Sequence, residues 1–124
     1  MEVTGEEVAA RLDDPVLTVL DVRSREEWSG EGGYGCDPRQ GHIPGARNVD
    51  VTELVARSPE EIRALLHLPE GAEIVAYCHS GARSEAATEA LRAAGYDARN
   101  YRGSWHEWSA DASRPVEVRA PAGS

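Results

Sequence analysis

Residues 73–84 read Glu73-Ile-Val-Ala-Tyr-Cys78-His-Ser-Gly-Ala-Arg-Ser84. The apolar run before Cys78 is typical of a buried strand, and Ser84 opens a helical pattern to Ala94 whose apolar stripe is Ala87, Ala90, Leu91 and Ala94. Cys78 therefore lies in a strand-to-helix turn, where free helix N–H groups and the helix dipole stabilise an anion. Such surroundings lower a thiol pKa and expose the thiolate as a nucleophile. Cys78 is thus the candidate nucleophile; the alternative is a small buried residue that ends a core strand.

Strands and helices alternate on both sides of this stretch. Three capping boxes predict helix starts, Pro59 suits the first position of its helix, and short β-branched runs predict strands. The alternation predicts an α/β domain with a mostly parallel sheet whose ligands bind beyond the carboxyl ends of the strands, where Asp21 and Cys78 both fall. The expected strands are 17–20, 46–49, 73–77 and 97–101; the expected helices are 4–12, 24–28, 58–66 and 84–94, with a helical turn at 105–108.

Composition limits the classes of function. The 124 residues suffice for one domain, expected over 1–110, with a tail rich in Ala, Ser, Pro and Gly over 111–124. A net charge of −9 with scattered Arg argues against nucleic acid and against anionic membranes as partners. The absence of Lys excludes Schiff-base chemistry. The acidic start lacks the features of a secretory signal, and two cysteines form no disulfide framework, so a cytoplasmic protein with reduced thiols is expected.

Four motifs resemble the rhodanese family of sulfurtransferases, most closely the C-terminal catalytic domain of the two-domain thiosulfate enzymes. They are Leu20-Asp-Val-Arg23, Gly41-His-Ile-Pro-Gly-Ala46, the loop from Cys78 to Arg83, and Tyr101-Arg-Gly-Ser-Trp-His-Glu-Trp108. The resemblance implies a three-layer domain, with a five-stranded parallel sheet and helices on both faces. It also implies a Cys78 persulfide that takes sulfur from a donor such as thiosulfate and passes it to cyanide or a thiol, without cofactor or metal. A protein acceptor is left open.

The predicted site centres on the cysteine loop. Asp21 and Arg23 are expected to be mainly structural, His42 to fix a turn, and Trp105 to anchor the core. Arg83 has two interpretations: it binds donor oxygens, or it clamps carboxylates such as Glu85 or loop carbonyls. The substrate-binding residues are expected to be His79, Ser80, Gly81, Ala82 and Arg83, and the supporting residues Asp21, Arg23, His42, Ser84 and Trp105.

Loop length distinguishes sulfur transfer from phosphate hydrolysis. Four residues separate Cys78 from Arg83, one fewer than in related cysteine-based phosphatases, so the smaller cradle favours a persulfide sulfur over a phosphate. A non-catalytic binding or redox-sensing module is the main alternative, and a phosphatase a weaker one. Two departures from the resemblance concern the donor: Arg102 stands where many relatives have Asp, and Glu27 where many have Arg.

A Gly-rich segment precedes the second motif. This insert, residues 29–40, contains Cys36 and reads as a functional lid or a mobile loop. Cys36 has two interpretations: it reaches Cys78 and exchanges sulfur with it, or it is a surface bystander. A metal site of Cys36, Asp37 and His42 is disfavoured because the short paired ligand spacings of zinc motifs are missing.

Overall fold

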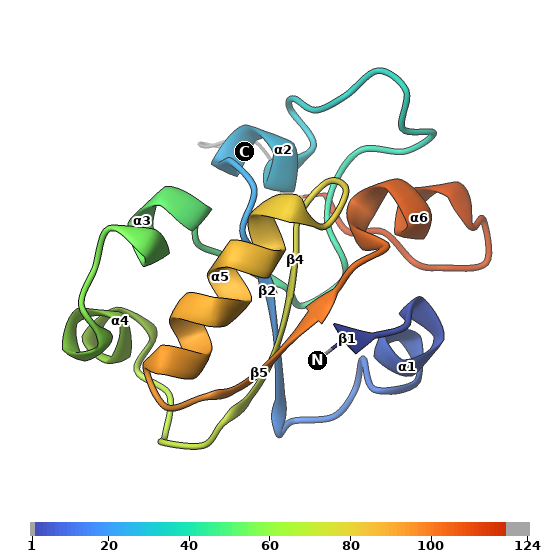
Figure 1. The fold of residues 1–124 in the computed structure, drawn as a ribbon. Helices are drawn as coiled ribbons and strands as arrows, with labels where there is room; N and C mark the ends of the chain where they lie inside the picture. The colour runs from blue at the N-terminus through green and yellow to red at the C-terminus, as the bar shows by residue number, and fades with distance from the viewer. Residues whose placement is uncertain (1, 119–124) are drawn as a thin grey trace.

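A five-stranded sheet forms the centre of the computed structural model, which describes residues 2–118. Its strand order is β1-β5-β4-β2-β3, and every pairing is parallel (Figure 1). The α/β class and the five parallel strands are therefore confirmed. The strands are β1 (Glu2–Val3), β2 (Leu17–Asp21), β3 (Arg47–Asn48), β4 (Glu73–Tyr77) and β5 (Asp97–Tyr101).

Six helices connect and cover the strands. Thr4, Ser24 and Ser58 each accept a hydrogen bond from the third residue of their helix, whose Glu side chain bonds back, so all three capping boxes are confirmed. Within residues 2–118, no helix is long and apolar enough to cross a membrane. The helices are α1 (Gly5–Ala10), α2 (Arg25–Ser29), α3 (Val51–Val55), α4 (Pro59–Leu66), α5 (Ala82–Ala93) and α6 (Ser104–Ala110).

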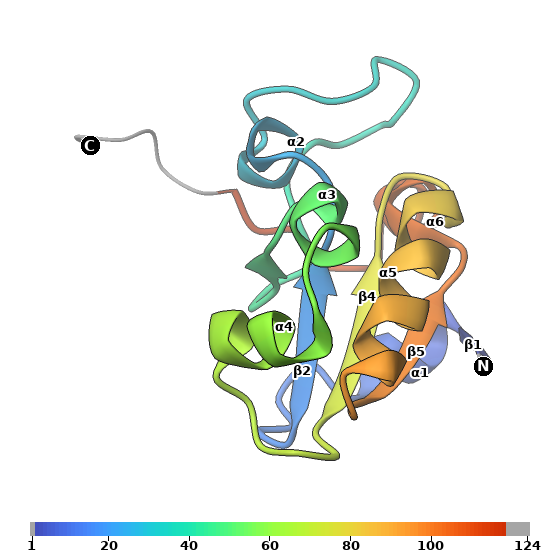
Figure 2. The same cartoon turned by 60° about the vertical axis from the view of Figure 1, so that its left-hand side comes forward.

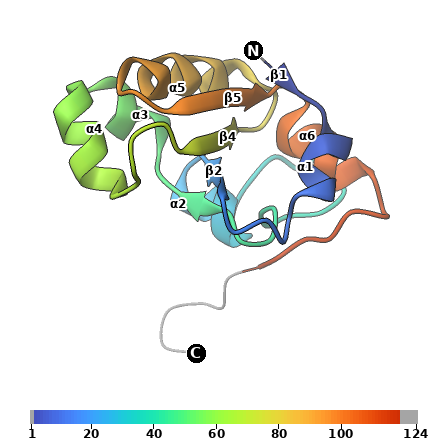
Figure 3. The ribbon, with the colours of Figure 1, turned by 90° about the horizontal axis from the view of Figure 1, so that it is seen from below.

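The sheet separates two hydrophobic cores, because successive side chains of a strand point to opposite faces. On β4, Ile74 and Ala76 pack with α3, α4 and α5, whereas Val75 and Tyr77 pack with α1 and α6. Figures 2 and 3 show the two helical layers on either side of the sheet. The central strand β4 is thus buried on both faces and delivers Cys78 to the end of the sheet where β2 also ends.

Several element boundaries differ from the sequence prediction. The strand expected at 46–49 contains only Arg47–Asn48, and the helix expected from Ser84 begins at Ala82. Two short elements, β1 and α3, were not expected: β1 exists through its pairing with β5, and α3 begins after Asp50, whose side chain accepts the N–H of Thr52. Short elements of this kind depend on their partners more than on local pattern.

The predicted tail, residues 111–124, is described as far as residue 118. Glu117 forms an antiparallel bridge with His42, in which each backbone N–H donates to the other's carbonyl at 2.9 Å. This part of the tail therefore contacts the second motif. The predicted domain boundary at residue 110 stays a prediction.

Candidate active site

The loop between β4 and α5 holds the Cys78 thiol among hydrogen-bond donors. Sγ lies 3.1 Å from the Gly81 backbone nitrogen and 3.4 Å from Ser84 Oγ, and Cys78 is only 1% exposed. Gly81 has φ +98°, and a Cβ built there would lie 2.6 Å from the carbonyl oxygen of Arg102. The turn therefore requires glycine both for its backbone conformation and for its close contact with the segment after β5.

These donors favour the thiolate. Burial opposes ionisation, but the Ser84 hydroxyl and the backbone N–H groups of Ser84, Gly81 and Ser80 outweigh it, and the pKa of Cys78 is lowered. The Ser84 hydroxyl has a single proton, and Asn100 Oδ1 at 2.6 Å competes for it. The backbone amides therefore stabilise the thiolate constantly, whereas the Ser84 hydroxyl does so only when its proton points to Sγ and not to Asn100.

The start of α6 is fixed to the same loop. The Cys78 N–H donates to Ser104 Oγ at 3.1 Å, while the N–H groups of Trp105 and His106 donate to the carbonyls of Cys78 and His79 at 2.9 and 3.0 Å. Trp105 is fully buried in the core, as expected, and its Nε1 donates to the carbonyl of Arg39. The fourth motif thus holds the cysteine loop in place through two backbone hydrogen bonds and the Ser104 side chain.

Arg83 is paired with a carboxylate other than the one expected. Its guanidinium donates to both oxygens of Glu27, at 3.0 and 3.1 Å, and within the described residues it forms no ion pair with Glu85. Partial burial opposes ionisation of Glu27, but the Arg83 and Ser24 hydrogen bonds overcome it and lower the pKa of Glu27 to about 2. The clamp interpretation of Arg83 is therefore the one that this geometry favours, with Glu27 as its partner.

Asp21 and Arg23 form a buried ion pair beneath the loop. The Asp21 carboxylate accepts the Arg23 N–H at 2.9 Å and its guanidinium at 2.7 Å. Arg23 also donates to the carbonyl of Gly41 at 2.6 Å, and its guanidinium lies 4.9 Å from the Trp105 ring centroid. These contacts join β2, the first residue of the second motif and α6, which is the structural role expected of the pair.

His42 lies apart from the thiols and fixes its turn. Its Nδ1 is 2.7 Å from the carbonyl oxygen of Trp28, its Nε2 is 3.0 Å from Glu117 Oε1, and its ring stacks on Trp28. The grouping of Cys36 with His42, considered from the sequence, therefore does not occur.

His79 instead turns toward the insert. Its Nε2 lies 3.1 Å from Asp37 Oδ1, which also lies 3.0 Å from His106 Nδ1, and the ring of Tyr34 stacks on His79. From the sequence, His79 was expected among the substrate-binding residues, His106 had no assigned role, and Asp37 was considered only together with Cys36 and His42. His106 lies inside the fourth motif, between Trp105 and Glu107, but no local pattern indicated its partner.

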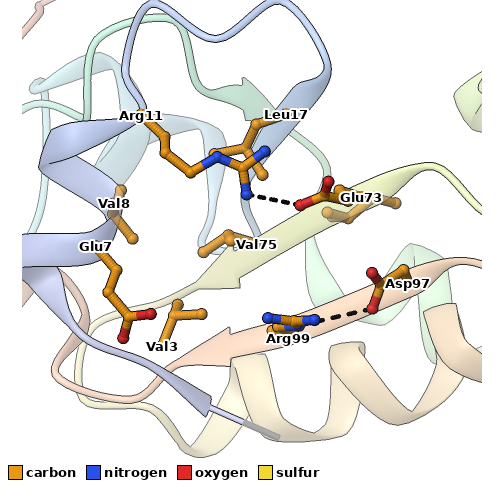
Figure 4. A pocket seen from close by; sticks show the side chains of 10 residues that line it. Val3, Glu7, Val8, Arg11, Leu17, Glu73, Val75, Asp97 and Arg99 are labelled. Carbon is orange, nitrogen blue, oxygen red and sulfur yellow. Dashed lines mark hydrogen bonds and ion pairs between the residues drawn. The ribbon is translucent and has the colours of Figure 1, made fainter.

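A pocket at the opposite end of the sheet contains none of these residues (Figure 4). It is lined where β2, β4 and β5 begin, at Leu17, Glu73 and Asp97. Two ion pairs cross it: Arg11 to Glu73 at 2.6 Å and Arg99 to Asp97 at 3.6 Å. These four charges are paired within the pocket, and Glu7, which also lines it, accepts the N–H of Thr4, so the cysteine end of the sheet remains the candidate site.

Comparisons with known proteins show the family of the chain. A family model described as a rhodanese-like domain matches residues 4–111. A Pseudomonas aeruginosa protein named "Probable 3-mercaptopyruvate sulfurtransferase" is 38% identical over 86% of this chain and 41% of its own length. The human thiosulfate:glutathione sulfurtransferase is 37% identical over 73% of this chain and 76% of its own. A crystal structure named "Probable Thiosulfate Sulfurtransferase" is 43% identical, with a TM-score of 0.81, over 94% of this chain and 47% of that one.

The chain therefore spans less than half of two of these relatives. It covers 41% of the Pseudomonas protein and 47% of the crystallised one. The human relative is the one of the three whose length it largely matches.

Proposed function

The chain belongs to the rhodanese-like family, and from that membership we propose that it is a sulfurtransferase that carries one sulfane sulfur on Cys78 as a persulfide. The observation that supports this most directly is the contact of Cys78 Sγ with the Gly81 N–H at 3.1 Å, at a buried cysteine whose pKa the loop donors lower. A buried thiolate with fixed donors is a prepared nucleophile.

The proposed reaction has two displacements at sulfur and no net oxidation. The Cys78 thiolate attacks the outer sulfur of a donor such as thiosulfate, an S–S bond forms, the donor's S–S bond breaks, and sulfite leaves with its electron pair. A thiophilic acceptor then attacks the terminal sulfur of the persulfide: cyanide leaves as thiocyanate, and a thiolate leaves as its persulfide. Cys78 returns as the thiolate, so no base and no cofactor is required.

The ion pair between Arg83 and Glu27 bears on which donor is used. Both terminal nitrogens of the Arg83 guanidinium already donate to the Glu27 carboxylate. A dianion such as thiosulfate therefore gains little attraction from Arg83 and is repelled by the negative charge of Glu27. The pair favours donors of lower charge, such as small-molecule persulfides, with thiosulfate as a slower substrate. The chemistry needs Cys78 reduced, which suits a cytoplasmic location.

The direct test is intact mass after incubation with a donor. Thiosulfate or a glutathione persulfide should add the mass of one sulfur atom, and cyanide should remove it while thiocyanate appears. Cys78→Ser should abolish the adduct and thiocyanate production.

Cys36→Ser is the matched control, because it removes the other thiol and should leave both signals intact. An adduct lost in Cys36→Ser and retained in Cys78→Ser would assign the sulfur to the wrong cysteine for this proposal. An unmodified wild-type mass with every donor would favour the non-catalytic module.

A further inference from the structure

Three distant segments bring four groups with metal-binding atoms to one place beside the cysteine loop. Cys36 and Asp37 come from the insert, His79 follows Cys78, and His106 lies in the first turn of α6. One ligand atom from each lies within 4.8 Å of all the others. Among residues 2–118, no other group of three or more His, Cys, Asp or Glu residues is arranged in this way.

Asp37 is the centre of the cluster. Its side chain is 1% exposed although it lies in a mostly exposed loop, and its Oδ1 is 3.1 Å from His79 Nε2 and 3.0 Å from His106 Nδ1. A buried carboxylate needs compensating charge. In this structure both His79 and His106 turn a ring nitrogen toward the Asp37 carboxylate. A metal cation bound by Asp37, His79 and His106 supplies the compensating charge as well.

The neighbouring contacts hold these groups in position. Tyr34 stacks on His79 with ring centroids 4.0 Å apart, and the rings of His79 and His106 meet edge to face at 5.5 Å. Arg39, two residues after Asp37, donates to the carbonyls of Ser109, Asp111 and Arg114 at 3.1, 2.7 and 2.8 Å. The insert is therefore anchored to the far end of α6, which fixes Asp37 opposite His106.

The distances are close to those of a tetrahedral site. Bonds of about 2.0 to 2.3 Å to nitrogen, oxygen and sulfur place neighbouring ligand atoms roughly 3.3 to 3.7 Å apart. The two Asp37 to His distances, 3.0 and 3.1 Å, are already near this value. Cys36 is exposed, so its side chain has room to complete the fourth corner.

We propose that Cys36, Asp37, His79 and His106 bind one Zn²⁺ ion and thereby tie the insert to the loop that contains Cys78. One sulfur, two nitrogens and one oxygen form a donor set that suits zinc, a borderline-soft ion without redox chemistry. The thiolate and the carboxylate balance the two positive charges, and the proton of the Cys36 thiol is released on binding. Four protein ligands close the coordination sphere, which makes the site structural.

An ion at this site holds the cysteine loop against α6 and takes no part in sulfur transfer. His79 is adjacent to Cys78, and its carbonyl accepts the N–H of His106. A metal shared by both imidazoles and the insert therefore stabilises the contact between α6 and the loop. The proposal stands independently of sulfur transfer, because it concerns ion binding alone.

Cobalt(II) titration of reduced, metal-free protein tests the ligand set. Wild type and Cys78→Ser should each bind one Co²⁺ per chain, with a near-ultraviolet cobalt–thiolate band and the strong visible bands of a tetrahedral ion. Cys36→Ser should lose the thiolate band, and because Cys36 is exposed its substitution leaves the core intact. A band that disappears in Cys78→Ser and persists in Cys36→Ser would overturn the proposal, as would the absence of binding in wild type.

Zinc affinity, measured by competition with a chromophoric chelator, tests the remaining ligands. Asp37→Asn and His106→Asn should weaken Zn²⁺ binding at least about 100-fold, because even outer-shell partners of a metal contribute 10- to 100-fold. His67→Asn is the matched control: His67 is exposed at the end of α4 and should change affinity less than about threefold. Zn²⁺ should also raise the melting temperature of wild type and leave that of Cys36→Ser unchanged; equal affinities or equal melting shifts in all variants would overturn the site.

Discussion

The Cys78 loop and the insert each bring a thiol to the same end of the sheet, but different groups hold them in place. In the loop, the nearest donor to Sγ is a backbone amide three residues away, Gly81, and the turn depends on its positive φ. In the insert, the anchors are side chains that reach across the sequence: Arg39 bonds to residues 69 to 75 positions away, and Asp37 to His79 and His106.

Because of this difference, we expect the loop to control the reactivity of the Cys78 thiol and the insert to control the stability of the fold. Substitutions in the loop should change the reactivity of the thiol, since the contacts that stabilise the thiolate are short-range. Substitutions in the insert should change stability and leave persulfide formation nearly intact, since the insert touches α6 and His79 instead of Sγ. The following variants test that division, from the largest expected effect to the smallest.

Gly81→Ala should cause the greatest loss. Alanine at φ +98° is strained, and its Cβ would meet the Arg102 carbonyl oxygen at 2.6 Å, so the turn must move and Sγ loses its amide donor. Removal of one such donor costs on the order of 100-fold or more in rate. Thiocyanate production measures the effect.

Gly71→Ala is the control for backbone strain alone. Gly71 has φ +78°, and a Cβ there meets nothing within 4 Å, so it should cost about 1 kcal/mol of stability and leave the rate unchanged. Similar activities for the two variants would show that the close contact at Gly81 does not limit the reaction.

Arg39→Ala should lower the free energy of unfolding by about 2 kcal/mol, because a charged donor to several part-buried carbonyls is lost. Persulfide formation should stay within about threefold of wild type, since the contacts of Sγ are unaffected. Urea unfolding measures the first effect and intact mass the second. Arg57→Ala, which removes a surface pair with Glu53 at 3.6 Å, should change stability by less than about 0.5 kcal/mol; a large rate loss in Arg39→Ala would contradict the division.

Glu27→Gln should improve the use of thiosulfate. The variant keeps the shape of the side chain and frees the charge of Arg83, so KM for thiosulfate should fall about two- to fivefold, which corresponds to the roughly 0.5 to 1 kcal/mol of one partly exposed ion pair. Glu26→Gln, exposed and adjacent, removes the same net charge and should have little effect. Equal shifts in both variants would assign the effect to net charge.

The same pair sets a pH dependence of stability. The pKa of Glu27, about 2 in the folded protein, lies below its usual value of about 4.3. The stabilisation is therefore present above pH ~4.3 and is lost as the pH falls toward 2. Any stability advantage of wild type over Glu27→Gln should shrink across that window in acid unfolding.

Ser84→Ala should have the smallest effect, a shift in the pH dependence of thiol reactivity. Because the pKa of Cys78 is lowered, the thiolate persists as the pH falls. Without the Ser84 hydroxyl the pKa of Cys78 rises, so on acidification the rate of alkylation by iodoacetamide should begin to fall at a higher pH in Ser84→Ala than in wild type. Metal-free Cys36→Ser protein provides a single thiol for the measurement. Thr88→Val removes a buried hydroxyl one turn further along α5, bonded to the Ser84 carbonyl, and should leave the profile in place; an identical shift in both would exclude a specific role for Ser84.

The same contrast explains what the sequence could predict. Strand 73–77 has the predicted bounds because a continuous apolar run defines it locally. Strand 97–101 also has the predicted bounds, although its sequence is Asp-Ala-Arg-Asn-Tyr; Gly95, which ends the preceding helix, marks where it can begin. The capping boxes at Thr4, Ser24 and Ser58 located three helix starts for the same reason. β1 and α3 were missed because two and five residues carry too little pattern.

Within the candidate site, local chemistry was readable and long-range pairing was not. The sequence indicated a thiol in a strand-to-helix turn with Gly81 and Arg83. It could not indicate that Arg83 pairs with Glu27, 56 residues away, in place of Glu85. Nor could it indicate that Asp37 joins His79 and His106, since each of these residues lies in a segment whose position depends on the folded sheet.

Both outer strands of the sheet are two residues long. β1 pairs with Asn100 and Tyr101 at the end of β5, and β3 with Leu20 and Asp21 at the end of β2. Long, flat, apolar edges are what recruit strands from other molecules, whereas short or charged edges resist such pairing. The remainder of β5 carries the ion pair of Asp97 and Arg99. This sheet is therefore protected against edge-to-edge aggregation, and the chain should stay dispersed at concentrations at which proteins with longer bare edges assemble into fibres.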